Sequence, residues 1–243
     1  MIDIHCHILP GVDDGSPDLE ESLEMARMAV HSGVTKLAAT PHFPGREDAL
    51  ELLPEFRRTL AALQQALAAA GIPLTLQAGA EILCLPETRE LAARHQLPTY
   101  AGTNHILTEF YFDESFGFMD RALSDLIACG YRPVIAHPER YDVIQQDTRR
   151  LDRWVRLGCL IQLNKGSLLG TFGRRPETAA HEILARGLAH AIASDGHSAA
   201  TRTPHMGQIS RWAKEACTPE CARILLRENP KRILAGRPPV GAE

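Results

Sequence analysis

The chain has 243 residues and a formal net charge of −4, so it is long enough for one large core but lacks the basic excess that binding to a nucleic-acid backbone requires. No segment approaches the run of about 18 apolar residues that a membrane-spanning helix needs, and the first residues lack the features of a signal peptide. We therefore expect a cytoplasmic protein with no membrane insertion and no nucleic-acid partner.

Short apolar segments rich in branched residues alternate with longer segments of helical periodicity as far as about residue 195. This alternation predicts seven strands, at residues 1–4, 36–39, 74–80, 105–109, 132–136, 160–163 and 188–193. The first helix is expected to have Ser16 as its N-cap and Pro17 at its first position, and to end at Gly33. Helical spacing predicts that its buried face comprises Leu19, Leu23, Ala26 and Val30. Later helices are expected to end at Gly71, Gly130, Gly158 and Gly187.

No linker, charge block or low-complexity segment interrupts this succession of strands and helices. It predicts a single parallel α/β domain over residues 1–243, with right-handed crossovers that place the helices outside. A seven-stranded (β/α) barrel accounts for the sequence better than a doubly wound sheet, because polar residues follow nearly every strand and a barrel brings all strand ends to one mouth.

Candidate metal ligands stand at six of the seven predicted strand ends. They are, in chain order, His5 and His7, His42, Glu81, Glu109, His137, and Asp195 with His197. Five of the eleven histidines therefore lie where the mouth of a barrel would collect them. Imidazole and carboxylate groups two residues apart on one face of a strand are well placed to hold one ion. The pattern predicts a metal site at the carboxyl ends of the strands.

Each signal taken alone has a simpler interpretation. The histidines of the HxH motif could be half-exposed surface residues, and His42 could belong to an ordinary turn. Glu81 and Glu109 could be solvated loop carboxylates, although both end strongly apolar strands, where an unpaired buried charge would be costly. Asp13 and Asp14 could serve as local caps of the first helix.

The six cysteines include no CxxC pair, which argues against a disulfide framework and against a thiolate zinc site. Cys6 lies between His5 and His7, but strand alternation turns it to the opposite face. We therefore expect a packed thiol rather than a ligand there.

Taken together, the strand-end motifs resemble the polymerase and histidinol phosphatase (PHP) superfamily, whose fold is a distorted seven-stranded barrel with a trinuclear metal site. The closer resemblance is to the bacterial manganese-dependent protein-tyrosine phosphatases of capsule and exopolysaccharide loci. The motifs that carry it span nearly the whole chain: DIHCHILPGVDDG at 3–15, ATPH at 39–42, GAE at 79–81, TEF at 108–110, AHPER at 136–140, SDGH at 194–197 and RTPHM at 202–206.

The resemblance implies three divalent ions. The first would be held by His5, His7, Glu81 and Asp195, the second by Glu81, Glu109 and His137, and the third by Asp14, His42 and His197. Ligand chemistry alone allows Mn, Fe, Zn or Mg, and the resemblance favours Mn. Carboxylates at positions 14 and 109, where other branches have histidines, indicate the tyrosine phosphatase branch. The remaining histidines match no ligand position and are expected to be structural: His31, His95, His105, His181, His190 and His205.

The implied reaction is hydrolysis of a phosphomonoester by a metal-bridging hydroxide, which requires no cysteine nucleophile. Arg140 and Arg202 follow metal ligands closely and are expected to hold phosphoryl oxygens, although both could form ordinary surface salt bridges. The family's usual substrate is the tyrosine-rich tail of a membrane-bound bacterial tyrosine kinase. The alternatives are a small-molecule phosphatase of the histidinol-phosphate type and a non-catalytic PHP binding module.

Two further groups of residues lie near the expected mouth. Aromatic residues after the fourth strand could flank a phosphotyrosine ring, but core packing is the favoured interpretation: Phe110, Tyr111, Phe112, Phe116 and Phe118. Lys165, Arg174 and Arg175 could attract an acidic phosphorylated tail, but a solvated basic loop is the default expectation.

Overall fold

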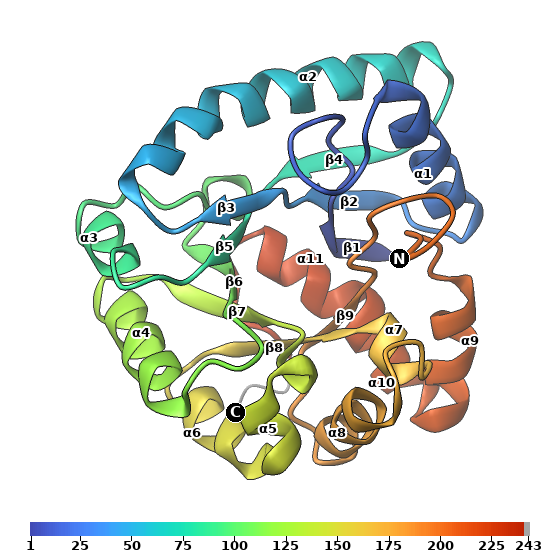
Figure 1. The fold of residues 1–243 in the computed structure, drawn as a ribbon. Coiled ribbons are helices and arrows are strands. Elements are labelled where there is room, and N and C mark those ends of the chain that lie inside the picture. The colour runs from blue at the N-terminus through green and yellow to red at the C-terminus, as the bar shows by residue number, and fades with distance from the viewer. Residues whose placement is uncertain (241–243) are drawn as a thin grey trace.

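The computed structural model describes residues 1–240 and consists of short parallel strands surrounded by helices (Figure 1). The strands are β1 (Ile2–Cys6), β2 (Lys36–Ala39), β3 (His42–Pro44), β4 (Thr75–Ala78), β5 (Glu81–Leu83), β6 (His105–Glu109), β7 (Arg132–Ala136), β8 (Leu160–Asn164) and β9 (Ala191–Ala193). The helices are α1 (Leu19–His31), α2 (Leu53–Ala69), α3 (Thr88–Ala93), α4 (Phe116–Ala128), α5 (Asp142–Gln146), α6 (Leu151–Arg156), α7 (Lys165–Leu168), α8 (Arg174–Ala185), α9 (Gly207–Ala216), α10 (Pro219–Arg223) and α11 (Asn229–Leu234). Single 3₁₀ segments lie at Glu47–Leu52, Tyr100–Gly102, Pro138–Arg140 and Thr148–Arg150, and a π-helical segment at Ile224–Glu228.

The strands form two parallel sheets, ordered β1-β2-β4 and β3-β5-β6-β7-β8-β9. A parallel bridge between Cys6 and Gly196 joins the end of β1 to the segment after β9. The predicted parallel α/β class is confirmed, and all carboxyl strand ends lie on the same side of the molecule.

The structure contains two short strands, β3 and β5, that the sequence pattern does not predict. The segment predicted at 74–80 forms β4 only as far as Ala78, and a separate strand, β5, begins at Glu81. In the same way β2 ends at Ala39 and the unpredicted β3 begins at His42. Residues 1–240 therefore contain nine strands rather than seven.

The gaps between β2 and β3 and between β4 and β5 both have local causes. Pro41 has no backbone N–H to donate to a neighbouring strand, although its carbonyl oxygen accepts from the N–H of Glu81 at 3.0 Å. At Gly79 an added Cβ would lie 3.0 Å from both Thr40 and Tyr100, so only glycine allows this close approach.

The other predicted strands are confirmed, three of them with the same bounds: β2, β6 and β7. β1 runs on to Cys6 and β8 to Asn164. The prediction that the last strand begins at residue 188 is wrong. The Leu188 N–H donates to the Ile183 carbonyl at 3.2 Å, which closes the turn after α8, and β9 begins only at Ala191.

The start of α1 also differs from the prediction. Asp18 is the N-cap, since its side chain accepts from the N–H of Glu21 at 3.0 Å, whereas the Ser16 hydroxyl donates to the Asp18 carbonyl at 2.8 Å. The buried face is also rotated from the predicted one, because Leu19 is 46% exposed. The residues buried on α1 are Ser22, Met25, Ala26 and Ala29. The predicted helix ends are confirmed by left-handed φ at Gly33, Gly71, Gly130, Gly158 and Gly187.

One face of several strands is apolar near the amino end and polar near the carboxyl end. Leu107, Leu160 and Ala193 belong to a buried apolar cluster. Two residues further along the chain stand Glu109, Gln162 and Asp195, which strand alternation places on the same side. The functional groups are thus presented at the carboxyl end by strands whose other residues fill the core.

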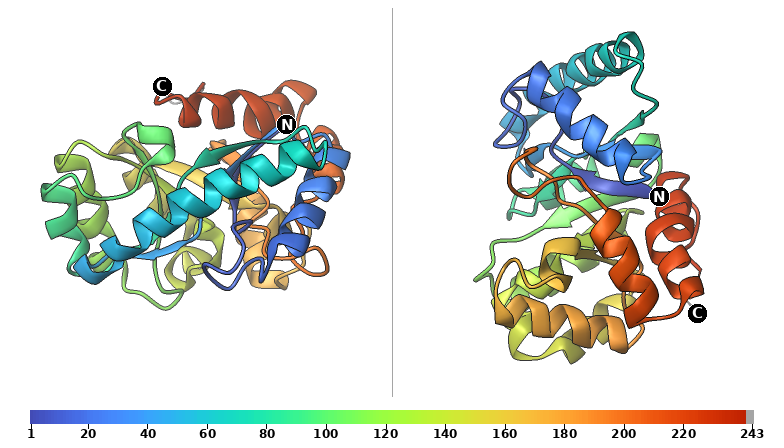
Figure 2. Two further views of the ribbon diagram at one scale, coloured as in Figure 1. Left: turned by 90° about the horizontal axis from the view of Figure 1, so that it is seen from above. Right: turned by 90° about the vertical axis from the view of Figure 1, so that its right-hand side faces the viewer.

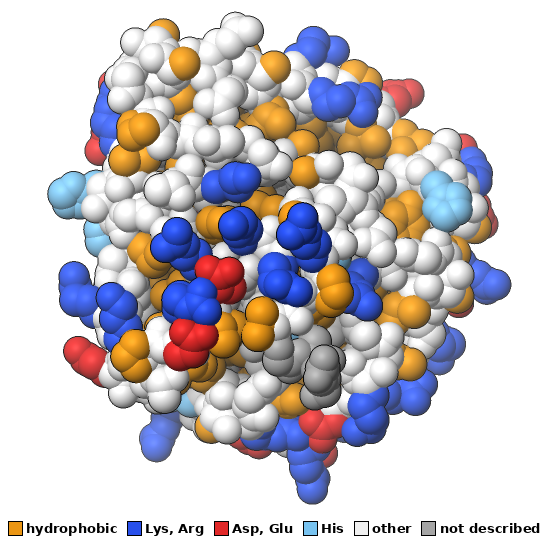
Figure 3. All heavy atoms as spheres, turned by 180° about the vertical axis from the view of Figure 1, so that it is seen from behind, with side chains coloured by type: hydrophobic (Ala, Val, Ile, Leu, Met, Phe, Trp, Pro, Cys, Tyr) orange, Lys and Arg blue, Asp and Glu red, His pale blue; other side chains and the backbone are white. Residues whose placement is uncertain are grey.

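Helix α11 lies at the opposite, amino end of the strands and crosses behind them (Figures 1 and 2). Ile233 and Leu234 pack into the same apolar cluster as Ile2 and Ile4. Seen from behind, Lys and Arg side chains gather near the middle of this face (Figure 3). Among the described residues, no helix has both the length and the apolar character needed to cross a membrane.

Candidate metal centre

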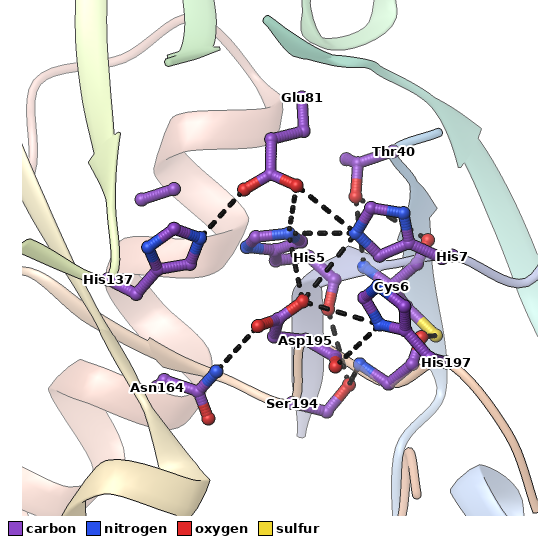
Figure 4. Close-up of polar contacts among 12 residues, drawn as sticks. His5, Cys6, His7, Thr40, Glu81, His137, Asn164, Ser194, Asp195 and His197 are labelled. Atoms are coloured by element: carbon purple, nitrogen blue, oxygen red, sulfur yellow. Dashed lines mark hydrogen bonds and ion pairs between the residues drawn. The ribbon is translucent and has the colours of Figure 1, made fainter. Parts of the chain in front are cut away.

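Four predicted ligands meet where β1 and β9 end and β5 begins, since Glu81 is the first residue of β5 (Figure 4). The Nε2 atoms of His5 and His7 lie 3.2 Å apart, and Glu81 Oε2 lies 3.2 Å from each of them. Asp195 Oδ1 lies 3.4 Å and 3.5 Å from the same two nitrogens. Each of these side chains is at most 1% exposed. The structure therefore gathers the complete set expected to hold the first ion.

Glu81 lies at the centre of the site. Its Oε1 contacts His137 Nε2 at 2.9 Å, while its Oε2 lies 3.3 Å from His42 Nδ1. His42 Nδ1 is also 3.0 Å from Glu109 Oε1. The set expected for the second ion was Glu81, Glu109 and His137, but the ligand atoms within 4.8 Å of one another belong to His42, Glu81 and Glu109. His137 lies on the other oxygen of Glu81, so the structure brings it into the site but not into this group.

The third expected set, Asp14, His42 and His197, is brought together with His7 as a fourth member. Asp14 Oδ1 lies 3.3 Å from His42 Nε2 and 3.5 Å from His197 Nε2. Asp14 is 68% exposed, so this part of the site is open to solvent. The predicted acidic residue before α1 thus faces the mouth rather than capping the helix.

The carboxylates reverse the effect of burial on the histidines. Burial lowers the pKa of His5, but the nearby charges of Glu81 and Asp195 outweigh it and raise the pKa to about 8. Burial raises the pKa of the Asp195 carboxyl, but His5, His7 and His137 together outweigh it and bring the pKa well below its usual value. Positive charge is therefore strongly favoured among these side chains, whether it comes from protons or from metal ions.

The donor set fits divalent metal ions. Within residues 1–240, two buried atoms that face the cluster, Asp195 Oδ1 and His197 Nε2, have no hydrogen-bond partner. The cluster combines imidazole nitrogens with carboxylate oxygens and contains no thiolate, since Cys6 points away and its thiol donates to the Gly196 carbonyl at 3.4 Å. Such mixed sets suit Mn, Fe, Zn or Mg.

Three buried or half-buried polar residues support the ligands from behind. Asp13 Oδ2 lies 2.8 Å from His7 Nδ1, and Gln162 Oε1 lies 2.9 Å from His5 Nδ1. Asn164 Nδ2 donates to Asp195 Oδ2 at 2.7 Å. Contacts of this kind fix the ring orientation and tautomer of a metal-binding histidine. Sequence reasoning considered Asp13 only as a local cap and missed Gln162 and Asn164, for which the available signal was a pair of amides two residues apart at the end of an otherwise apolar strand.

Backbone strain is concentrated at the same place. Five non-glycine residues of the described chain have positive φ, and three of them belong to the site: His137 at 36°, Asp195 at 50° and Arg202 at 40°. Such conformations persist only where surrounding contacts enforce them, and they occur preferentially at functional positions.

Both predicted arginines reach the site. Arg202 Nη2 donates to Asp195 Oδ2 at 2.6 Å, and Arg140 Nη1 lies 3.6 Å from the same oxygen. The two oxygens of Asp195 therefore have different neighbours, with histidines around Oδ1 and the two arginines and Asn164 around Oδ2. Neither arginine forms the ordinary surface salt bridge of the simpler interpretation.

The aromatic segment divides into core and surface residues. Phe110 is buried, Phe116 stacks on Trp154 with ring centroids 5.3 Å apart, and Phe118 packs against the core. Core packing is confirmed for these three, whereas Tyr111 and Phe112 are 55% and 43% exposed.

The basic segment after β8 is only partly solvated. Arg174 and Arg175 are exposed as expected. The expectation is wrong for Lys165, which is 9% exposed and whose Nζ donates to the carbonyl oxygens of Thr203 and His205. The six histidines expected to be structural belong to none of the candidate metal groups found within residues 1–240.

Comparison with known proteins agrees with this geometry. The family model described as "Capsular polysaccharide synthesis, CpsB/CapC" matches residues 1–235. Tyrosine-protein phosphatase YwqE of Bacillus subtilis is 39% identical over 84% of this chain and 80% of its own length. Tyrosine-protein phosphatase CpsB of Streptococcus pneumoniae is 30% identical over 96% of this chain and 98% of its own.

Solved structures give the same result. A crystal structure from a study of YwqE and CpsB, described there as metal-dependent tyrosine phosphatases, superposes with a TM-score of 0.87 at 34% identity and covers 98% of both chains. An organophosphorus hydrolase variant from Deinococcus radiodurans shares the fold alone, with a TM-score of 0.62 at 16% identity. The chain belongs to the CpsB/CapC family of capsular polysaccharide synthesis proteins.

Proposed function

We propose that this protein is a metal-dependent protein-tyrosine phosphatase that acts in capsule or exopolysaccharide synthesis. The observation that carries the proposal is that nine predicted ligands and two arginines from different strands converge on one site, in a chain that matches the CpsB/CapC family over residues 1–235. The relatives' names as tyrosine-protein phosphatases supply the substrate class. The physiological substrate would be the phosphorylated tail of a bacterial tyrosine kinase.

The cluster would hold three divalent ions, with Mn²⁺ as the favoured metal. His5, His7, Glu81 and Asp195 would bind the first ion, Glu81 with Glu109 and His137 the second, and Asp14, His42 and His197 the third. Support comes from the separations among these side chains and from the unpartnered Asp195 Oδ1 and His197 Nε2. When bound, the ions would supply Lewis acidity toward the phosphoryl oxygens and an activated water as nucleophile.

The remaining tasks fall to residues of the chain itself. Arg140 and Arg202 bind the phosphoryl oxygens and stabilise the charge that develops there during transfer. Asn164 keeps Asp195 in place when a phosphate group competes for Arg202. A phenolate leaving group has a parent pKa of about 10, so a strong general acid is not required, and we assign none.

The two sheets would together form one distorted seven-stranded barrel in a single domain. β2 and β3 would make up one interrupted barrel strand, and β4 and β5 another. The Cys6–Gly196 bridge, which joins β1 to the end of β9, supports this arrangement.

The test is a substrate panel with defined metals. Protein freed of metal by a chelator should be inactive, and Mn²⁺ should restore hydrolysis of a phosphotyrosine peptide better than Mg²⁺, Zn²⁺ or Fe²⁺. Iodoacetamide should leave most of the rate, because no thiol takes part. Faster turnover of histidinol phosphate than of the peptide would favour the small-molecule alternative. Full metal occupancy without hydrolysis of any phosphoester would favour a binding module.

A further inference from the structure

The guanidinium groups of the two site arginines are held differently. Arg202 is fixed by its 2.6 Å hydrogen bond to Asp195. Arg140 lies 3.6 Å from the same carboxylate, and within residues 1–240 its side chain makes no hydrogen bond, although it is only 19% exposed. A guanidinium has five N–H donors, which in a largely buried arginine normally have hydrogen-bond partners. The side chain of Arg140 departs from this rule. The donors of Arg140 are therefore available to an incoming anion.

Two aromatic rings take the place of polar partners. The Cζ atom of Arg140 lies 4.4 Å from the centroid of the Phe112 ring and 4.6 Å from that of the Phe172 ring. Both separations are within the range of cation–π attraction, which acts on the face of the guanidinium and leaves its N–H edge free.

The order of the strands explains how the rings reach Arg140. Arg140 follows β7, while Phe112 follows β6 and Phe172 lies between α7 and α8, in the connection after β8. Since β6 and β8 are the two neighbours of β7, the rings approach from the connections on either side.

Contacts with neighbouring segments support the position of each aromatic residue. The N–H of Asp142 donates to the Phe112 carbonyl at 2.8 Å, which ties the loop after β6 to the one after β7. At Gly166 an added Cβ would lie 2.7 Å from Phe172 Cε2, so the glycine leaves room for that ring. Phe112 also meets His137 edge to face, at 6.0 Å between centroids.

We propose that Phe112 and Phe172 form an aromatic clamp that positions Arg140 for phosphoryl binding. The clamp covers the guanidinium without occupying its donors and restricts a side chain that would otherwise sample many rotamers. It thereby keeps Arg140 from closing onto Asp195 and aims its N–H edge at the phosphoryl oxygens. This role rests on the proposed phosphatase function, and the two rings are positioning residues that act through Arg140.

The test is a double-mutant cycle. Phe112→Leu and Phe172→Leu, which keep an apolar side chain but remove the ring, should each lower kcat/KM for a phosphotyrosine peptide about three- to tenfold, as the loss of one cation–π contact predicts. Phe112→Tyr should retain activity. In an Arg140→Ala background the same Leu substitutions should cost less than about twofold, because the group that they position is gone. Tyr111→Leu is the matched control, since Tyr111 is an exposed aromatic in the same loop.

A second readout separates this inference from the proposed function. Calorimetric titration of the Mn²⁺-loaded protein with inorganic phosphate should show weaker binding by both Leu variants at unchanged metal content. Wild-type phosphate affinity and kcat/KM in both variants would overturn the clamp. So would equal losses with and without Arg140, because the rings would then act independently of it. An inactive wild-type protein whose phosphate affinity still depends on the rings would overturn the phosphatase function but not the clamp.

Discussion

Histidines are buried at both ends of the parallel strands. At the amino end, His105 begins β6 and His190 precedes β9, and burial together with the charge of Arg132 lowers the pKa of each to about 4. At the carboxyl end the pKa of the equally buried His5 is raised to about 8 by Glu81 and Asp195. Burial beside a positive charge therefore keeps His105 and His190 neutral, whereas the adjacent carboxylates give the buried His5 the opposite shift.

Among residues that bind no metal, the two arginines at the carboxyl end are expected to have the largest effect on activity. Arg140→Ala and Arg202→Ala should each lower kcat/KM on a phosphotyrosine peptide about a hundred- to thousandfold, as loss of a fixed donor to transition-state charge typically does. Metal content should not change. Arg237→Ala, an exposed arginine near the C-terminal helices, is the control and should have almost no effect. A loss of less than about threefold in either site variant, with metal retained, would show that this arginine has no part in phosphoryl transfer.

A smaller effect is expected from the residues behind the ligands. Asp13→Ala and Gln162→Leu should each weaken Mn²⁺ binding about ten- to a hundredfold, because His7 and His5 lose the partners of their second ring nitrogens. Asp18→Ala is the matched control, since this nearby carboxylate caps α1 and should cost about 1 kcal/mol of stability without changing metal affinity. Titration of chelator-treated protein with Mn²⁺ measures the difference, and equal affinities in all three variants would contradict the supporting role.

The smallest effect is expected from His105, at the amino end of the strands. It changes the free energy of unfolding rather than the activity. The pKa of His105 is lowered from 6.5 to about 4, so between these pH values the unfolded chain binds a proton that the folded protein does not. The stability that follows is fully present above pH 6.5 and is lost as pH falls toward 4. His105→Leu should reduce the fall in unfolding free energy between pH 7 and pH 5 by about 2 kcal/mol. An unchanged fall, measured by urea denaturation of metal-free proteins, would show that His105 is not the titrating group.

The predictable part of the molecule is the part that local pattern determines. The apolar strands β2, β6 and β7 have the predicted bounds, and Glu109 and His137 follow from where two of them end. All nine predicted ligands and both arginines reach one site because parallel strands bring their carboxyl ends together.

What sequence reasoning missed depends on contacts between distant segments. The interruption at Gly79 follows from the close approach of Thr40 and Tyr100, and the burial of Lys165 from carbonyl groups nearly forty residues away. Pairing of His42 with Glu109 arises in the same way, because the two lie 67 positions apart in the chain. Spacing along one strand carries no information about such partners.

Glu81 provides the most direct test of the metal centre, since it contacts His5, His7, His42 and His137. Metal analysis of Mn²⁺-loaded wild-type protein and of Glu81→Gln, alongside turnover of a phosphotyrosine peptide, measures both properties of the site at once. We expect about three ions per wild-type chain, the loss of at least one in the variant, and a fall in turnover of about a thousandfold or more. If Glu81→Gln kept both its metal content and its full activity, the residues at the carboxyl ends of the strands would not form a catalytic metal cluster.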